Sequence, residues 1–366
     1  MRIVFRTDAS VLIGTGHVMR CLTLANLLSQ YGHDCLFISR SHEGNLNELI
    51  KKKGFRLIQL YAPKYFDLSM QNVNEDMYAT WLGVPWEDDA YQSLNAVMSF
   101  SPDWLIVDHY ALDAKWERIM SEVVGKIMVI DDLANRDHEC TLLLDQNLGR
   151  RFSDYDGLVP AKCHRLIGPK YALLRPEFAQ QRMRCLGRQK VAKLNRILIS
   201  LGGVDNTNVT GQVLDALSRS SLSKSIELDI VMGDSAPYLN YVRLQAKKLP
   251  FNATVNVNVT NMAERMSLAD LSIGAAGATS WERCCIGLPS IAIVLADNQQ
   301  MIGAALAEKG AGVVLDAKKI DEDLIKVIKS ITSSDKKLLN CIQKAKEVCD
   351  GNGTSRVISF MTEVMQ

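Results

Sequence analysis

The sequence lacks both an excess of charge of one sign and a long apolar run. Its 42 basic and 41 acidic residues give a net charge of +1, so the chain offers no general field for nucleic acid or for an anionic membrane. The longest apolar run, residues 284–296, contains Gly and Pro and is too short to span a bilayer. Charged residues interrupt the N-terminal apolar run, whereas a signal peptide has an uninterrupted apolar segment. We therefore expect a cytoplasmic protein that binds neither nucleic acid nor membrane. A monomer is the default expectation, since the sequence does not indicate an oligomeric state.

Motifs for metals and for several common catalytic sites are also missing. The nine cysteines form no CxxC pair and no Cys/His spacing typical of zinc, so we expect reduced, mostly buried thiols. Asp131, Asp132 and Asp137 have no matching ligand set elsewhere, and residues 321–323 fall in a charged stretch that is expected to be a surface helix. No GxGxxG fingerprint and no GxSxG elbow is present. The sequence predicts neither a bound metal nor a cofactor.

The sequence is long enough, and apolar enough, to form two α/β domains. It has 366 residues, of which 47% are hydrophobic and 23% charged, as in ordinary globular proteins. Short apolar segments alternate with helical patterns, which favours parallel strands in doubly wound, Rossmann-like sheets. The first set of strands comprises residues 3–5, 35–39, 57–60, 104–107, 127–130 and 142–144, and the second comprises residues 197–201, 226–232, 254–257, 271–273, 290–295 and 313–315.

A linker is predicted between the two sets of strands. Pro169, Pro176 and a polar run over residues 180–193 place it within about residues 168–192. The predicted domains are therefore residues 1–175 and residues 190–350. Because ligands bind beyond the carboxyl ends of parallel strands, we expect the ligand in a central cleft that the two domains face.

The first candidate site segment leads from a strand end through a glycine loop into a helix over residues 16–30. Gly14 and Gly16 allow the backbone to approach a ligand, with Thr15 between them, and a helix N-terminus suits an anion or a polar sugar. His17 and Arg20 lie one turn apart, opposite the apolar stripe, and are predicted to point toward the strand ends. A histidine there can take a proton from water. The alternative is a capping loop with a surface His and Arg.

The second segment repeats this pattern at the start of the second domain. Gly202 and Gly203 follow a strand, and Asn208 lies just before the next helix. Asp205 or Asn206 is expected to cap that helix. The segment is interpreted as a loop under a diphosphate or, alternatively, as an ordinary strand-to-helix turn.

The third segment, residues 274–283, again joins a strand to a helix through small residues. Thr279 and Ser280 offer donors to phosphate oxygens, and the two carboxylate oxygens of Glu282 suit both hydroxyls of a ribose. Asn298 and Gln299 open a further helix and suit sugar hydroxyls. A favourable charge at a helix start and simple helix capping are the competing interpretations of these residues.

These segments together resemble one family, the UDP-2,4-diacetamido-2,4,6-trideoxy-β-L-altropyranose hydrolases (PseG) of pseudaminic acid biosynthesis. The last third, with Asn261-Met262-Ala263-Glu264 and residues 274–283, is also similar to the UDP-binding half of MurG-type glycosyltransferases. The motifs of the hydrolase family are Arg6-Thr7-Asp8-Ala9-Ser10, Gly14-x-Gly16-His17-x-x-Arg20, Asp76-Met77-Tyr78-Ala79-Thr80-Trp81-Leu82-Gly83, Val107-Asp108-His109-Tyr110, Ile130-Asp131-Asp132-Leu133, Asp145-Gln146-Asn147-Leu148 and residues 168–178.

The resemblance implies a GT-B architecture, with a final helix over about residues 351–366 that packs back toward the first domain. It implies His17 as catalytic base, Tyr78 near the sugar and Glu282 on the UDP ribose. The other substrate-binding residues that it implies are Asp108 in the first domain, Gly277, Thr279 and Ser280 at the diphosphate, and the backbone from Val259 to Met262 at the uracil.

The function that follows is metal-free hydrolysis of a UDP-linked 2,4-diacetamido-2,4,6-trideoxy-β-L-altropyranose to UDP and the free sugar. Water attacks the anomeric carbon with inversion, or alternatively the β-phosphorus. A MurG-like glycosyltransferase and a non-catalytic nucleotide-sugar binder are the competing hypotheses.

Overall fold

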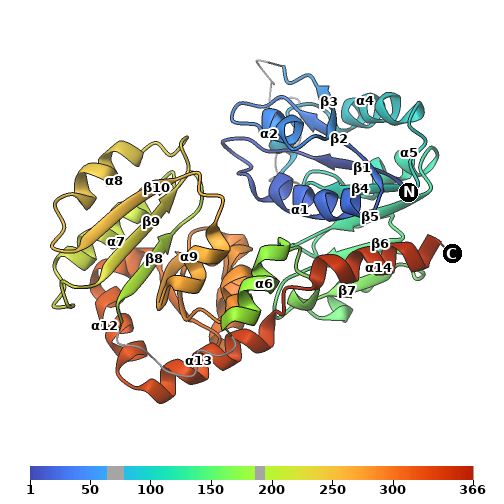
Figure 1. Ribbon diagram of the computed structural model, residues 1–366. Coiled ribbons are helices and arrows are strands. Elements are labelled where there is room, and N and C mark those ends of the chain that lie inside the picture. Colours follow the sequence, from blue (N-terminus) through green and yellow to red (C-terminus); the bar gives the residue numbers. More distant parts are fainter. Residues whose placement is uncertain (64–77, 186–193, 366) are drawn as a thin grey trace. The chain divides into compact units, whose positions relative to one another are not determined.

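The computed structural model describes residues 1–63, 78–185 and 194–365, and the chain divides into two compact units (Figure 1). The first unit contains Met1–Gln146, Arg150–Leu173 and Thr354–Gln366, and the second contains Asn147–Gly149 and Leu174–Gly353. The C-terminal helix therefore belongs to the unit that the N-terminus begins. Within the described ranges, no helix combines the length and apolar character needed to cross a bilayer.

The first unit is built on a seven-stranded parallel sheet with the strand order β3-β2-β1-β4-β5-β6-β7. This is the Rossmann order, in which the sheet winds outward in both directions from β1 and β4. The strands are β1 Arg2–Thr7, β2 Asp34–Arg40, β3 Arg56–Leu60, β4 Trp104–Asp108, β5 Lys126–Ile130, β6 Leu142–Asp145 and β7 His164–Ile167.

Helices cover both faces of this sheet, which is why its central strands are apolar runs rather than alternating patterns. On one face, α1 and α14 contribute Val18, Leu22, Val357 and Met361 to a single core. On the other face, α4 and α5 supply a second core that includes Trp116. The helices are α1 Gly16–Gln30, α2 Asn47–Lys52, α3 Ala79–Leu82, α4 Trp86–Met98, α5 Ala114–Ser121 and α14 Gly353–Met365, with short 3-10 turns η2 Phe152–Tyr155 and η3 Pro169–Tyr171.

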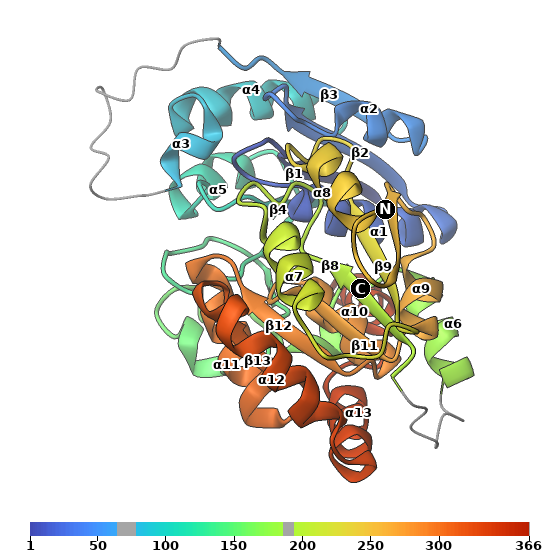
Figure 2. The same ribbon diagram turned by 90° about the vertical axis from the view of Figure 1, so that its left-hand side faces the viewer.

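The second unit repeats the plan with a six-stranded parallel sheet in the order β10-β9-β8-β11-β12-β13. Helices α7, α8 and α12 pack on one face, where α7 lies across the sheet in Figure 2. The strands are β8 Arg196–Ser200, β9 Glu227–Met232, β10 Asn252–Val257, β11 Leu271–Ala275, β12 Ser290–Val294 and β13 Val313–Asp316. The helices are α6 Pro176–Cys185, α7 Val209–Ser218, α8 Leu239–Ala246, α9 Met262–Leu268, α10 Thr279–Ile286, α11 Gln300–Lys309, α12 Ile320–Thr332 and α13 Asp335–Val348, with 3-10 turns η4 Asp297–Gln299 and η5 Ala317–Lys319.

Two doubly wound parallel sheets were the predicted fold, and the structure confirms them. The helix predicted over residues 16–30 is α1, and all nine cysteines are free, with Cys341 alone half-buried and the others buried. Strand β7 was not predicted, because charged side chains at its start leave only a short apolar run. Part of the predicted linker is the helix α6, with Pro176 at its first position and Glu177 in its first turn. Residues 186–193 lie outside the described residues.

The strand order places all three candidate segments where a ligand is expected. The order reverses between β1 and β4 in the first sheet and between β8 and β11 in the second. Helices that follow these strands turn to opposite faces, which leaves a crevice at the carboxyl ends. The loop that leads to His17 follows β1, and residues 202–203 and 276–279 follow β8 and β11.

Candidate active site

The centre of the site in the first unit is a hydrogen bond between an imidazole and a buried carboxylate. His17 is the second residue of α1 and is 8% exposed, whereas Asp108, the last residue of β4, is fully buried. Nδ1 of His17 lies 2.6 Å from Oδ1 of Asp108. Among the described residues, no side chain or backbone group binds Nε2 of His17. The imidazole is thus fixed through one nitrogen, with the other left for a ligand or for water.

The charge of Asp108 is held by Arg20, one turn beyond His17 on the same helix. Arg20 donates from Nε to Oδ2 and from Nη2 to Oδ1, both at 2.6 Å. Burial alone would raise the pKa of Asp108, but the charge of Arg20, and then that of His17, outweighs burial and lowers this pKa far below its ordinary value. Asp108 is therefore a carboxylate that can accept the proton of Nδ1, and in the tautomer that carries this proton Nε2 of His17 is the acceptor.

A second carboxylate extends this network to an aromatic residue. Nη1 of Arg20 lies 2.7 Å from Oδ2 of Asp132, which follows β5. The Tyr110 hydroxyl donates to the same oxygen at 2.6 Å. Burial, and then the charge of Asp132, raises the pKa of Tyr110 well above its ordinary value. Tyr110 therefore remains a protonated donor, and its ring is held in one orientation.

Aromatic rings form a wall beside the imidazole. The ring of Tyr110 meets that of His17 edge to face with centroids 4.6 Å apart, and Trp81 stacks on Tyr110 at 5.5 Å. Tyr78 completes the group, 5.1 Å from Tyr110 and 4.8 Å from Trp81. The predicted sugar residue Tyr78 thus lies one ring away from His17, although Asp76 and Met77 of the same motif lie outside the described residues.

The motif Arg6-Thr7-Asp8 lies beneath the site. Arg6, at the end of β1, donates to Asp8 at 2.7 Å and to Asp89 of α4 at 2.6 Å, and Arg40 also donates to Asp89. His109 is buried, with Nε2 3.4 Å from Oδ2 of Asp8. All of these side chains are buried, so their role is to join the ends of β1, β2 and β4 to α4.

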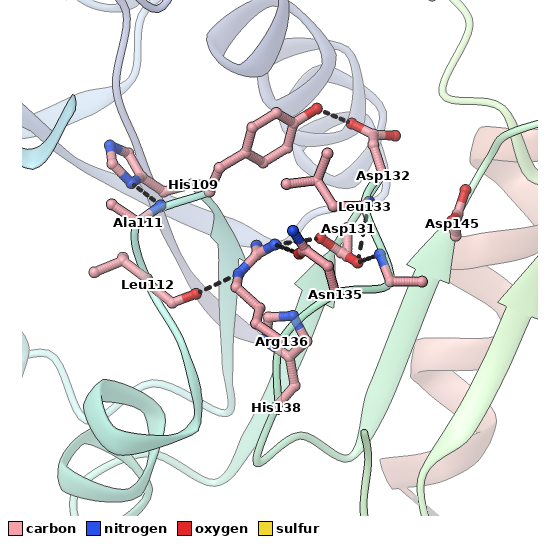
Figure 3. Close-up of polar contacts among 12 residues, drawn as sticks. His109, Ala111, Leu112, Asp131, Asp132, Leu133, Asn135, Arg136, His138 and Asp145 are labelled. Atoms are coloured by element: carbon pink, nitrogen blue, oxygen red, sulfur yellow. Dashed lines mark hydrogen bonds and ion pairs between the residues drawn. The ribbon is translucent and has the colours of Figure 1, made fainter. Parts of the chain in front are cut away.

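The acidic residues after β5 are used by the protein itself. Asp131 accepts hydrogen bonds from the backbone N–H of Leu133 and from Arg136 (Figure 3). It also accepts from the backbone N–H of Ala134 and from the hydroxyl of Tyr155. Within residues 1–63, 78–185 and 194–365, no group of three or more His, Cys, Asp or Glu side chains is arranged to hold a metal ion.

One predicted role changes with this geometry. Asp108 was expected to contact the substrate, but the side chain is fully buried and is bound by His17 and Arg20. Its carboxylate contacts two residues of α1 and has no exposed surface for a sugar. The loop residues Gly14, Thr15 and Gly16 are partly or fully exposed at the start of α1, and Gly14 makes its turn at φ +80°.

In the second unit, the segment after β8 is an exposed loop that ends in a helix cap. Gly202 (φ +103°) and Gly203 are exposed. Asn208 caps α7 by accepting from the Gly211 N–H at 3.2 Å. Asp205 accepts from the backbone N–H groups of the first two residues of α7, which confirms its predicted capping role. Asn206 is exposed, and the first N–H groups of α7 are bound by Asp205 and Asn208 instead.

The segment after β11 brings several predicted residues together. Thr279, the first residue of α10, is exposed, but Ser280 is buried and its N–H donates to the Gly277 carbonyl. Ser280 therefore belongs to the frame of the loop, and its hydroxyl accepts from Arg283. Gln299 lies beside this loop, since a Cβ at Gly277 would be 3.7 Å from its Nε2.

The remaining predicted residues lie at the same end of this sheet. The Oε1 of Gln299 accepts from the Leu295 N–H at 3.0 Å, while Asn298 in η4 is exposed. Val259 lies in the connection from β10 to α9, and Met262 is the first residue of α9; both are half-buried. Because all six strands are parallel, these connections follow carboxyl ends, as the loop after β11 does.

Glu282 has an unusual protonation equilibrium. It lies in the first turn of α10 and is half-buried. Burial raises its pKa to about 7, although the charges of Arg175 and Arg283 act in the opposite direction. The carboxyl group therefore changes its charge near neutral pH, where it can respond to a ligand.

The sequence predicted no role for Trp81, Tyr110 and Arg283, and for Asp132 it considered only an unsupported metal site; the structure places all four beside predicted residues. The sequence contained a signal for Trp81 and for Asp132. Trp81 is three residues after Tyr78, a spacing at which helical side chains are neighbours. Asp132 follows β5 and Asp108 ends β4, which are adjacent strands of one parallel sheet.

Comparison with known proteins supports the resemblance. Residues 197–355 match the glycosyltransferase family 28 C-terminal domain. The chain is 28% identical over 311 residues to the UDP-2,4-diacetamido-2,4,6-trideoxy-beta-L-altropyranose hydrolase of Campylobacter jejuni, covering 85% of this chain and 97% of that protein. It is also 28% identical over 278 residues to the spore coat polysaccharide biosynthesis protein SpsG of Bacillus subtilis, covering 75% and 80% of the two chains.

Similarity to solved structures identifies the overall architecture. MurG of Acinetobacter baumannii aligns with a TM-score of 0.67 and 15% identity, over 99% of each chain. The chain therefore has the GT-B fold, residues 197–355 are similar to the glycosyltransferase family 28 C-terminal domain, and its resemblance to the PseG hydrolases is confirmed.

Proposed function

We propose that this protein hydrolyses a UDP-linked sugar, with His17 as general base. The observation that carries the proposal is the 2.6 Å contact between Nδ1 of His17 and the buried carboxylate of Asp108. That contact fixes the imidazole so that Nε2 accepts a proton. The similarity to a UDP-sugar hydrolase over 85% of the chain supports the same activity.

In the proposed reaction, a water molecule donates a proton to Nε2 of His17 while its oxygen attacks the anomeric carbon from the face opposite UDP. The bond between this carbon and the diphosphate oxygen breaks, and its electron pair leaves with UDP. The products are UDP and a free sugar of inverted configuration. The positive end of the α10 dipole and the exposed hydroxyl of Thr279 stabilise the charge that UDP gains.

The proposed sugar is the one in the name of the Campylobacter jejuni relative, a 2,4-diacetamido-2,4,6-trideoxy-β-L-altropyranose. Its acetamido methyl groups and its 6-deoxy position are apolar, and they suit the rings of Tyr78, Trp81 and Tyr110 beside His17. A fully hydroxylated hexose would leave hydroxyl groups against those rings without partners, which lowers affinity.

Hydrolysis in ¹⁸O-labelled water tests the attack at carbon. We expect the label to appear in the free sugar and not in UDP, because the proposed nucleophile meets the anomeric carbon. Mass spectrometry of both products after a single turnover measures this directly. Label in UDP would contradict the proposal, since it means that water attacked phosphorus.

A glycosyltransferase is the second candidate, because residues 197–355 match a glycosyltransferase domain. Both activities need UDP held in the second unit, so nucleotide binding does not separate them. A hydrolase releases UDP and free sugar at full rate without any acceptor, whereas a transferase requires one. Incubation of the protein with the UDP-sugar alone therefore decides between the two.

Glu282 gives a pH-dependent test of the nucleotide site. If its carboxylate accepts the ribose hydroxyls, uridine binds the ionised form, and binding favours loss of the proton. With the pKa of Glu282 at about 7 in the free protein, we expect uridine affinity to rise about tenfold from pH 6 to pH 8. Calorimetry should show proton release at pH 6.

The matched variant is Glu282→Gln, which keeps the shape of the side chain and removes the titration. Its uridine affinity should be nearly constant from pH 6 to pH 8. The same pH profile in both proteins would assign the titration to another group and would exclude Glu282 from the ribose site.

A further inference from the structure

Arg283 is a buried cation without an ion pair. The residue lies on α10 and is 1% exposed, and its guanidinium has no acidic partner among the ion pairs of the described residues. Its Nε makes no hydrogen bond. The arginines of the first unit differ, since the buried Arg6 and Arg40 and the half-buried Arg20 each contact at least one carboxylate.

The guanidinium is directed into the loop that connects β11 to α10. Nη2 donates to the carbonyl of Ala275 at 2.7 Å and to the Ser280 hydroxyl at 2.8 Å, and Nη1 lies 3.4 Å from Oγ1 of Thr279. Space for it is made by Gly274, because a Cβ at that position would lie 2.3 Å from Nη1. The loop thus binds the guanidinium through its carbonyl and hydroxyl groups, and Gly274 leaves the space that the guanidinium occupies.

A buried charge without a counter-charge is costly, and proteins otherwise pair such groups. Burial lowers the pKa of Arg283 to about 10, with Cys284 and Glu282 acting in the opposite direction, so the side chain is still a cation at neutral pH. Hydrogen bonds to one carbonyl and two hydroxyls satisfy its N–H groups in part but provide no negative charge. An anion bound at the loop would supply the missing charge.

We propose that Arg283 is a positioning residue for the diphosphate of the nucleotide. Its charge stabilises the anion from beneath the loop, and its donation to Oγ1 of Thr279 leaves the exposed Thr279 hydroxyl hydrogen to point at a phosphate oxygen. The same field stabilises the negative charge that UDP gains when it leaves. This inference rests on the proposed function, because it assumes that UDP binds at the loop.

The test compares ligands that differ only in phosphate. Dissociation constants for uridine, UMP and UDP are measured for the wild type and for Arg283→Met. We expect the variant to bind UDP about 10- to 100-fold more weakly, the range for losing a charged hydrogen-bonding partner, and to bind uridine with less than about threefold change. Equal losses for uridine and UDP, or no loss for either, would overturn the proposal in favour of a purely structural role.

Glu282→Gln is the matched control on the same helix. It removes a group proposed for the ribose, so it should weaken uridine, UMP and UDP by one common factor at pH 8. Arg283→Lys, which keeps the charge, should recover part of the preference of the wild type for UDP over uridine, and the absence of any recovery would overturn the role of charge.

If Arg283→Met does not fold, Thr279→Val tests the same contact. This substitution should not disturb the fold, because Thr279 is exposed and valine has nearly the same shape. We expect UDP to bind about 3- to 10-fold more weakly and uridine to bind unchanged; an unchanged UDP affinity would overturn the proposed contact.

If wild-type protein binds neither UDP nor uridine, the proposed function itself is wrong. If it binds both and Arg283→Met keeps the ratio, only the present inference is wrong.

Discussion

Replacing His17 by leucine is expected to lower the turnover of the UDP-sugar by at least 10²- to 10⁴-fold, the range that a general base contributes. Leucine is close in size but has no nitrogen to take the proton from water. The affinity for UDP should change little, because the proposed nucleotide site is in the second unit, whereas His17 is in the first. Single-turnover rates and UDP dissociation constants measure the two effects separately.

The control is the same substitution at another histidine, His164→Leu. His164 lies at the start of β7, is exposed and contacts Phe360 of α14. Its loss should leave turnover within about twofold, as is usual for a surface position. Near-normal turnover of His17→Leu would remove His17 from the mechanism, and a parallel loss of UDP affinity would indicate a disturbed fold instead of a lost base.

The sequence predicts the position of His17 well because the information is local. The helical period over residues 16–30 and the glycines before it place His17 and Arg20 on the side of the strand ends, and α1 has these bounds. Both sheets follow from the alternation of apolar strands and helices in the same way. These inferences need only residues that are close in the chain.

The partner of His17 required the three-dimensional structure. Asp108 is 91 residues away in the chain, and its burial depends on the pairing of β4 with β1 and on the position of α1 above them. A carboxylate at a strand end is equally compatible with contact to a sugar and with support of a histidine. Only the side-chain direction separates these roles, and no periodicity encodes it.

Arg283 shows the same limit in the second unit. In the sequence it follows Glu282 as an ordinary charged residue at a helix start, and such residues are usually solvated. In the structure it is on the inner side of α10, because Gly274 leaves room for the guanidinium. The pairing of a glycine with an arginine nine residues later is visible only once the loop is folded.

Asp108→Asn should test the support of the base with an effect comparable to that of His17→Leu. Asparagine has nearly the same shape, but its amide group can donate as well as accept and carries no charge. It no longer fixes the proton on Nδ1 of His17, and it leaves Arg20 with Asp132 as its remaining carboxylate. We expect turnover to fall by about 10²- to 10⁴-fold, since the wrong tautomer places a proton on Nε2.

The same substitution should also lower the free energy of unfolding, by about 3–5 kcal/mol at pH 7, because it breaks a buried ion pair. The pKa of Asp108 is far below its ordinary value in the folded protein. Its contribution to stability is therefore complete above the unfolded pKa of about 3.9 and is lost as pH falls toward the folded pKa. Denaturant unfolding of the wild type and of Asp108→Asn should differ most at neutral pH and converge in acid.

Asp132→Asn separates the support of the base from the stability of the network. Asp132 shares Arg20 with Asp108 but does not contact the imidazole of His17. This variant should also unfold more easily, while its turnover stays within about tenfold of the wild type, because Asp108 still fixes the proton on Nδ1. If both variants lose turnover alike, the carboxylates act by holding Arg20 and the fold. If Asp108→Asn alone loses it, the short contact to Nδ1 is what makes His17 a base.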